Sequence, residues 1–346
     1  MINKSLITKN KKIFLINNEL NLDNFGNDEK LTLIQTLYST CKHGTENWII
    51  NEKAHWIKYK RDKSSNFFTN NVYKNSKESQ LLGNMFVGKI LKINTKNKKY
   101  KKNDIVLGYG GCSNFQTIKL SNIICKVKKN VPVENYLCFD PIEFSIGAIR
   151  DSNIKFGDNI GVVGLGAIGL ITIKFLKKSF ANTIVGVDQS SDRLKLAKKI
   201  GANIILKNKF NVIQKYRTKL NPTGLDMVID FSGSVSGLNT AISLSKYNGT
   251  VISGSMYPPA NSKLELGKEF HWNNIQIMSS RISNEPHKDH PAWNRSRLHK
   301  LIIGIIEKND VNFKNIINKI YPFKNSLSIY KKNMKDNKIL KLTFKH

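Results

Sequence analysis

The sequence predicts an α/β protein in which a doubly wound parallel sheet is joined to a smaller, β-rich region. From residue 158 to about residue 285, short apolar runs rich in Val and Ile alternate with segments of helical spacing, as they do when helices connect parallel strands. Before residue 131, short apolar runs are separated by glycine-containing and basic turns, which is typical of a β-rich domain. At 346 residues, the chain is long enough for two domains.

The β-rich region is predicted from runs that roughly alternate apolar and polar residues, as half-buried strands do. Its expected strands cover residues 30–38, 83–91 and 103–108. Residues 58–79 are rich in Lys, Asn and Ser and have no sustained period, so we expect a long surface loop there. Residues 131–150 change to helical spacing, and Asp140 stands inside that helical segment.

A glycine-rich turn follows a short apolar strand and opens a helix, in the pattern G-x-G-x-x-G. The first glycine permits a tight turn, the second lets the backbone approach a pyrophosphate, and the third lets the helix pack closely on the strand. The pyrophosphate would bind to unpaired N–H groups of the first helical turn. The expected cofactor contacts of this turn are Gly164, Gly166, Ala167, Ile168 and Gly169.

Asp188 lies at the carboxyl end of the next predicted strand, 19 residues after Gly169. Its carboxylate would accept hydrogen bonds from the ribose hydroxyls of an adenosine. A 2′-phosphate at about 4 Å would meet a like charge, and at an effective dielectric constant near 20 this repulsion is on the order of 4 kcal/mol. The sequence therefore predicts NAD as the cofactor in preference to NADP. The competing interpretation is an α/β domain without a ligand, in which the glycines only form turns and packing contacts.

The later strands of the predicted sheet each end at a turn. The remaining expected strands cover residues 225–233, 249–254 and 338–344. Because ligands bind at the carboxyl ends of strands in doubly wound sheets, Ser232 and Gly254 should face the same crevice as Asp188.

The formal net charge of +31 raises the question of an anionic partner such as nucleic acid. Only seven of the 56 basic residues are Arg, and Lys, Asn and Ile are used heavily along the whole length. Nucleic-acid-binding surfaces concentrate Arg and aromatic residues on one face. We therefore interpret the charge as a global compositional bias and expect no specific nucleic-acid partner.

The four cysteines are far apart and form no C-x-x-C pair, which is typical of a protein from a reducing cytoplasm. The longest apolar runs fall short of a membrane span, and the run at residues 13–16 is too short for the core of a signal peptide. We therefore expect a cytoplasmic protein without a membrane span, with a small molecule as its partner.

These features together resemble the medium-chain dehydrogenase/reductase superfamily, and the resemblance covers nearly the whole chain. It is carried, in the family's order, by Gly44 to Glu46, Gly83 to Val87, Gly157 with Asp158, Gly164 to Gly169, Asp188 with Arg193 and Leu194, Gly201 with Ala202, and Leu266 to Phe270. The Gly-Thr-Glu form, with Ser279 to Arg281 and the pattern Trp293-x-Arg295-x-Arg297, is similar to the subgroup that contains bacteriochlorophyllide dehydrogenase.

The resemblance implies an alcohol dehydrogenase-like, nicotinamide-dependent oxidoreductase. It implies a GroES-like catalytic domain at residues 1–150, completed by residues 291–346, and an NAD-binding Rossmann domain at residues 151–290. It also implies that Arg193 packs beside the adenine ribose, that Thr45 relays a proton from an alcohol, and that the protein is a homodimer or tetramer.

Zinc-dependent members of this superfamily hold a catalytic metal with Cys, His, and Glu or Cys, and this chain has His43, Asn84 and Asp140 at those positions. A neutral amide oxygen is a poor replacement for imidazole, and the sequence lacks the four-cysteine structural zinc lobe. We therefore expect no zinc. A zinc ion held by His43, Asp140 and Cys41 is the alternative.

The catalytic candidates are His43, Thr45 and Asp140. Without a metal, hydrogen-bond donors have to stabilise the developing alkoxide, and general acid–base catalysis contributes roughly 10²- to 10⁴-fold in rate. His43 can act as that acid or base, because histidine titrates near neutrality, or it can be a hydrogen-bonded histidine in a strand-to-helix turn. Thr45 and Glu46 can instead cap the following helix, and Asp140 can be an N-cap or a turn residue before a proline.

The predicted function is hydride transfer between NAD and an alcohol or carbonyl group, without zinc. The alternatives are a zinc-free reductase of activated double bonds and, outside enzymes, a degenerate cofactor-binding or nucleic-acid-associated protein. Trp293, Arg295 and Arg297 can bind an anionic substrate, but we favour a helix start at which Trp293 packs and both arginines stay in solvent. Residues 286–291 are interpreted as a solvated loop, not a metal site.

Overall fold

The protein is described by a computed structural model for residues 1–20, 31–53, 59–62, 64–72, 79–93, 99–257, 263–282, 291–309, 311–334, 336 and 338–346. The chain divides into two compact units, one formed by Met1–Cys138 with Ile303–His346 and the other by Phe139–Ile302. Each unit is described by itself.

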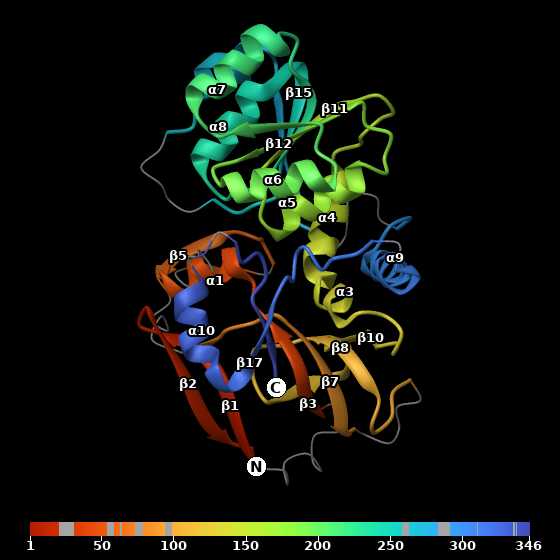
Figure 1. Cartoon of the computed structure of the whole chain (residues 1–346). Helices are drawn as coiled ribbons and strands as arrows, with labels where there is room; N and C mark the ends of the chain where they lie inside the picture. Colours follow the sequence, from red (N-terminus) through yellow and green to blue (C-terminus); the bar gives the residue numbers. More distant parts are fainter. Residues whose placement is uncertain are drawn as a thin grey trace. The chain divides into compact units, whose positions relative to one another are not determined.

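The first unit is built mainly from antiparallel strands (Figure 1). Its described strands are β1 (Ile2–Lys9), β2 (Lys12–Glu19), β3 (Leu31–Thr40), β4 (Tyr59–Arg61), β5 (Phe68–Val72), β6 (Gln80–Leu81), β7 (Met85–Lys92), β8 (Ile105–Tyr109), β9 (Phe115–Lys119), β10 (Ile123–Lys126), β17 (Ile320–Pro322) and β18 (Thr343–Lys345). Its described helical segments are α1 (His43–Ile50), η2 (Leu120–Asn122), α3 (Val133–Leu137), η5 (Phe323–Asn325) and α10 (Ser326–Asn333). Helix α9 (Arg295–Lys308) contains the boundary between the units.

Strand β3 organises the larger sheet of this unit, whose order is β10-β8-β7-β3-β18-β17 with β9 also paired to β3. It pairs antiparallel with β7, β9 and β18. Its inward residue Ile34 packs with Phe86, Ile90 and Val106 in one buried apolar cluster. Just after β3, the backbone N–H of Asn84 donates to the carbonyl of Thr40 at 3.0 Å, so the start of β7 lies beside the entry to α1.

Two elements of the first unit differ from the expectation. Strands β4 and β5 pair antiparallel within residues 58–79, which we expected to form a long surface loop or an insertion, and residues 58, 63 and 73–78 lie outside the described part of the chain. Their pairing joins Tyr59 to Val72 through the backbone, and polar strands of this kind carry no alternation that a sequence reading can detect. The strand expected at residues 338–344 is shorter and later, as β18.

The second unit is a parallel sheet with the order β13-β12-β11-β14-β15-β16. Its described strands are β11 (Asn159–Val163), β12 (Thr183–Asp188), β13 (Ile204–Lys207), β14 (Leu225–Asp230), β15 (Ser245–Ser253) and β16 (Gln276–Ser279). Its described helical segments are α4 (Phe139–Asp151), α5 (Ala167–Leu176), α6 (Ser191–Ile200), α7 (Phe210–Lys215), η3 (Tyr216–Leu220), α8 (Val235–Leu244) and η4 (Leu266–Phe270).

The strand order runs outward in both directions from β11, so the doubly wound sheet predicted from the sequence is confirmed. Helices α5 and α6 contact β11 to β13, and α8 contacts β11, β14 and β15. Apolar side chains such as Val163, Val185 and Val228 form the buried core. A sheet with this reversal binds ligands where β11 and β14 diverge, at their carboxyl ends.

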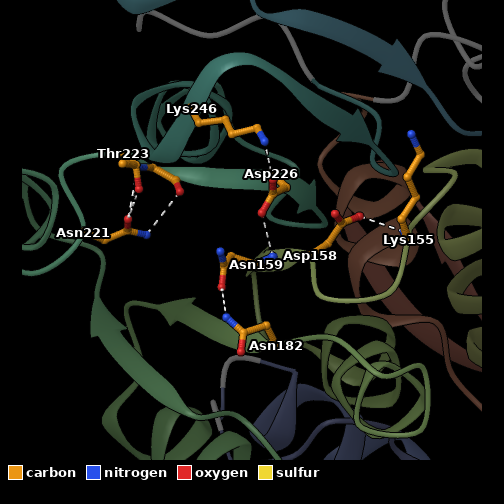
Figure 2. A network of polar contacts seen from close by, with 9 residues as sticks. Lys155, Asp158, Asn159, Asn182, Asn221, Thr223, Asp226 and Lys246 are labelled. Atoms are coloured by element: carbon orange, nitrogen blue, oxygen red, sulfur yellow. Dashed lines mark hydrogen bonds and ion pairs between the residues drawn. The ribbon is translucent and has the colours of Figure 1, made fainter.

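A polar network occupies the opposite, amino-terminal edge of this sheet (Figure 2). Asp226 of β14 pairs with Lys246 and accepts a hydrogen bond from the backbone N–H of Asn159 at 2.7 Å. Asn182, just before β12, donates to the side chain of Asn159 at 3.0 Å. These contacts tie β11, β12, β14 and β15 together at one edge and leave the carboxyl edge to the glycine turn.

None of the helices in the described ranges is long and apolar enough to cross a lipid bilayer.

Candidate functional site

The glycine turn lies at the carboxyl end of β11, as the sequence predicts. Gly164 has a φ of +87°, and a Cβ atom there would come within 2.5 Å of the backbone nitrogen of Ser232. A Cβ atom on Gly169 would come within 2.1 Å of the carbonyl oxygen of Gly164. Only glycine fits these two positions, since one needs a left-handed backbone and both need close packing.

Gly166 is the N-cap of α5, and no side chain caps the helix. A Cβ atom on Gly166 would meet no atom within 4 Å, so the backbone is open on that side. The N–H groups of Ala167, Ile168 and Gly169 belong to the first turn, where a helix has no internal acceptors. Unpaired donors and the helix dipole together favour an anion at this point. The turn therefore fits the pyrophosphate of a dinucleotide.

Asp188 is held against this turn from both sides. Its Oδ2 accepts a hydrogen bond from the backbone N–H of Leu165, and its Oδ1 accepts one from the N–H of Ser190, both at 2.7 Å. The carboxylate is thereby fixed between the glycine turn and the start of α6. Arg193 stands in the first turn of α6, and its backbone N–H donates to the capping Ser190 hydroxyl at 3.4 Å. The sequence-derived neighbours Asp188 and Arg193 thus lie at one strand end.

Ser232 and Gly254 stand just beyond the carboxyl ends of β14 and β15, in the region where we expected them. Between them lies Asp230, a buried carboxylate that the sequence analysis did not select. It accepts hydrogen bonds from the Ser232 N–H at 2.8 Å and the Tyr257 hydroxyl at 2.7 Å. Burial raises the pKa of Asp230 and also the pKa of Tyr257. An acid at the end of a buried strand is the same signal that identified Asp188, and it could have identified Asp230.

In the first unit, His43 is the first residue of α1 and Thr45 lies in its first turn, both partly buried. Glu46, one residue later, is buried and uses both of its carboxylate oxygens. Oε1 accepts from the backbone N–H groups of Lys42 and Gly83, each at 2.8 Å. Oε2 accepts from the hydroxyl of Tyr330 in α10 at 2.6 Å. Glu46 therefore ties the start of α1 to the turn before β7.

Asn84 follows that turn. Its backbone N–H is bonded to Thr40, and its carbonyl accepts from Gly110 N–H at 3.1 Å. Its side-chain Oδ1 is buried, and no donor in the described part of the chain bonds to it. Asn84 was expected only to be a poor metal ligand, and no sequence pattern reveals this unmatched acceptor.

The residues present do not fit a zinc ion. Cys41 lies 3.7 Å from Cys112, sulfur to sulfur, and burial, that contact and the negative charge of Glu46 raise its pKa well above the usual value. The Cys41 thiol is thus already in contact with Cys112. Glu46 is already bonded on both oxygens. In the described ranges, no three His, Cys, Asp or Glu side chains gather as a metal site would require.

Asp140 belongs to the second unit, in the first turn of α4, where it is buried. It therefore stands in a different unit from His43 and Thr45. One turn later in α4, Glu143 is buried, and its Oε1 lies 2.9 Å from Nε2 of His299 in α9. The edge of the His299 ring also packs on Phe139, which precedes Asp140.

Trp293 is buried before the start of α9, as the packing interpretation predicts. Arg297 is exposed and 41% of the Arg295 side chain is accessible, so both arginines stay largely in solvent, although each also makes a contact within the protein. The Arg297 guanidinium lies 4.8 Å from the Trp293 ring centre, and Arg150 lies 3.6 Å from it. Arg295 approaches Glu143 at 3.7 Å. Stacking on an indole stabilises a guanidinium without removing all of its hydration. Of residues 286–291, all but residue 291 lie outside the described residues.

Comparison with known proteins agrees with this geometry. Residues 167–295 match the family described as "Zinc-binding dehydrogenase". D-Guloside 3-dehydrogenase of Escherichia coli (strain K12) is 32% identical over 252 residues, which cover 72% of this chain and 72% of that protein. The chain belongs to the zinc-binding dehydrogenase family. (R,R)-Butanediol dehydrogenase of Bacillus subtilis (strain 168) is 28% identical over 170 residues, covering 49% of this chain and 47% of that protein.

Solved structures share the fold of this dehydrogenase over its whole length. The crystal structure of 2R,3R-butanediol dehydrogenase from Bacillus subtilis superposes with a TM-score of 0.76 at 16% identity, covering 99% of each chain. A Sinorhizobium meliloti 1021 protein described as a zinc-binding dehydrogenase, bound to NADP, gives a TM-score of 0.78 at 12% identity, covering 100% of each chain. The predicted Rossmann and GroES-like architecture is confirmed, and the chain is an alcohol dehydrogenase-like oxidoreductase of the medium-chain class.

Proposed function

We propose that this dehydrogenase uses NAD to oxidise a secondary alcohol of a polyol or sugar derivative, or to reduce the matching ketone, without zinc. The observation that carries the proposal is the Asp188 carboxylate, fixed 2.7 Å from the Leu165 N–H beside the uncapped start of α5. A carboxylate at this strand end accepts ribose hydroxyls and repels a 2′-phosphate. The substrate class is supported by relatives named D-guloside 3-dehydrogenase, (R,R)-butanediol dehydrogenase and L-idonate 5-dehydrogenase.

The cofactor contacts would come from the second unit. The N–H groups of Ala167, Ile168 and Gly169 bind the pyrophosphate, Asp188 binds the ribose hydroxyls, and Arg193 packs beside the adenine ribose. Ser232 and Gly254 border the crevice at the ends of β14 and β15. Bound NAD would supply the hydride acceptor.

The first unit would handle the proton. The Thr45 hydroxyl takes the proton of the substrate alcohol and passes it to His43, which acts as the general base in oxidation and as the general acid in reduction. Both side chains stand in the first turn of α1, whose backbone Glu46 fixes. Asp140 is assigned as the third catalytic residue, buried at the start of α4.

We propose that residues 1–150 and 291–346 form the catalytic domain and that residues 151–290 form the NAD-binding domain. A homodimer or tetramer and a cytoplasmic location complete the proposal. The four cysteines are all buried free thiols, which supports a reducing compartment. Placement near the bacteriochlorophyllide dehydrogenase subgroup stays a prediction from the motif at Gly44 to Glu46.

The test is an NADH and NADPH fluorescence titration of the wild type and of Asp188→Ala. The wild type should bind NADH saturably and more tightly than NADPH. Asp188→Ala should weaken NADH by about 10- to 100-fold, because a hydrogen bond to a charged group contributes about 1.5–3 kcal/mol. Asp188→Ala should also reduce the preference for NADH over NADPH, because the repulsion between the Asp188 carboxylate and the 2′-phosphate is removed.

The matched control is Asp192→Ala, which removes the same charge from an exposed position in the first turn of α6. This variant should keep the wild-type affinities. Absence of saturable NADH binding by the wild type contradicts the whole proposal, while unchanged discrimination in Asp188→Ala contradicts only the ribose contact.

A further inference from the structure

The side chain of Asn84 presents a polar atom that the protein itself leaves unsatisfied. Its Oδ1 is buried, and no donor within the described ranges reaches it, whereas its backbone N–H and carbonyl are both bonded. A buried acceptor without a donor costs about 1–3 kcal/mol. Such a cost at a functional site is characteristically recovered when a ligand brings the missing donor.

Glu46 determines where this acceptor lies. One oxygen of Glu46 is bonded to the N–H of Lys42 and to the N–H of Gly83, each at 2.8 Å. The backbone segments that continue into His43 and into Asn84 are therefore side by side. Gly83 has a φ of +99°, and an added Cβ would meet the backbone nitrogen of Cys112 at 2.5 Å, so this turn is closely fixed. Asn84 thus belongs to the same small region as His43 and Thr45.

The chemistry around Asn84 selects the kind of donor. A zinc ion is disfavoured as its partner, because a neutral amide oxygen is a weak zinc ligand. A second ammonium group is disfavoured in this region, because the buried Lys341 already places its Nζ 3.3 Å from the carbonyl of Cys41, the residue after Thr40. A neutral hydroxyl remains as the donor that satisfies an amide oxygen without adding charge to a buried site.

We propose that Asn84 Oδ1 accepts a hydrogen bond from a second hydroxyl of the substrate, on the carbon next to the one oxidised. Asn84 then makes this dehydrogenase selective for vicinal diols and polyols over simple alcohols. The inference rests on the proposed function, because it uses the same alcohol-binding region. A site built to bond a hydroxyl discriminates strongly against the analogue that lacks it, because the buried polar group stays unpaired.

The test compares (2R,3R)-butane-2,3-diol with 2-butanol as substrates for NAD reduction. The two differ by one vicinal hydroxyl. The wild type should show the higher kcat/KM for the diol. Asn84→Leu keeps a similar volume without the acceptor and should lower kcat/KM for the diol by about 10- to 100-fold, while 2-butanol changes by no more than about twofold.

Two further variants serve as controls. Asn122→Leu changes an exposed asparagine of the same unit and should leave the ratio of the kcat/KM values for the two substrates unchanged. Asn84→Ser keeps an acceptor on a shorter side chain. It should also lower the ratio of kcat/KM for the diol to kcat/KM for 2-butanol, so it replaces Asn84→Leu in the experiment if that variant does not fold. NADH affinity should be unaltered in every variant, because the cofactor contacts lie in the second unit.

Equal losses for both substrates, or an unchanged ratio in folded Asn84→Leu, would overturn the inference while the proposed function stands. So would a wild type that oxidises both substrates equally well. A wild type that binds NADH but oxidises no alcohol in a panel of mono-alcohols, diols and polyols overturns the proposed function and, with it, the inference.

Discussion

His346 is a partly buried histidine whose ring is kept neutral by its surroundings. Its Nε2 lies 2.8 Å from the Ser39 hydroxyl, its Nδ1 lies 3.1 Å from the Asn114 side-chain oxygen, and its ring stacks on Phe323 with centres 4.0 Å apart. Burial lowers the pKa of His346 to about 3. Protonation in the folded protein is therefore unfavourable at any mildly acidic pH.

The consequence for stability has a definite sign. Between about pH 6.5, where a histidine in an unfolded chain titrates, and pH 3, the unfolded state binds a proton that the folded state does not. The free energy of unfolding contributed by His346 is fully present above pH 6.5 and is lost as the pH falls through this window. His346→Gln should remove part of the acid sensitivity, by up to a few kcal/mol at about 1.4 kcal/mol for each pKa unit.

Urea unfolding of the wild type and of His346→Gln at a series of pH values between 7 and 4 checks this. The stability difference between the two proteins should shrink or reverse toward the acidic end. His271→Gln, at an exposed histidine, is the control and should follow the wild type. If the free energy of unfolding falls with pH in the same way for the wild type and for His346→Gln, the His346 ring titrates alike in the folded and unfolded states, which would contradict the prediction.

At the scale of elements, the segment that joins β3, α1 and the start of β7 decides whether the protein can bind zinc. The resemblance to zinc-dependent dehydrogenases places the ligand positions here and in α4, and at one of them this chain has the neutral amide of Asn84. We expect protein purified without chelator to contain far less than one zinc ion per chain by elemental analysis. Added Zn²⁺ should raise the melting temperature of the wild type no more than that of His43→Gln. Stoichiometric zinc that disappears in His43→Gln would contradict our interpretation of Asn84.

The strand, turn and helix of the second unit could be predicted because every determinant is local. The three glycines of the turn and Asp188 fall within a short segment, and their spacing alone requires β11, α5 and β12. The candidates His43 and Thr45 came from the resemblance to the medium-chain dehydrogenases around Gly44 to Glu46. The position of Asp188 is as expected, but its bonds to Leu165 and Ser190 needed the structure.

The remaining features depend on partners that are distant in sequence. The bond between Tyr330 and Glu46 joins residues 284 positions apart, and no local pattern announces it. The pair β4 and β5 was missed because backbone pairing, not alternation, defines it. The last strand was misplaced because Lys341 is buried in a run that would otherwise alternate. The unmatched oxygen of Asn84 is visible only once every neighbouring donor is known.

At the scale of the whole molecule, the charge of +31 acts as a diffuse field. The lysines of α6 at 195, 198 and 199 are all exposed, as expected if Lys fills surface positions generally. A single-stranded oligonucleotide labelled with a fluorophore should bind weakly at low salt. Its affinity should fall by at least about tenfold between 50 and 200 mM salt, because phosphate contacts release counterions. Tight binding that persists at high salt would identify a specific nucleic-acid site and contradict the compositional interpretation.

The last strand, β18, pairs with the early strand β3, and this pairing sets an order of folding during synthesis. The second unit is continuous, from Phe139 to Ile302, so its whole segment is available for folding before the end of the chain is made. The first unit waits for β18, because Thr343 pairs with Thr40 and Lys345 with Tyr38. Until then, the edge of β3 next to α1 is unpaired and open to association with other chains. The unit whose first residues are translated earliest is therefore the last to be completed.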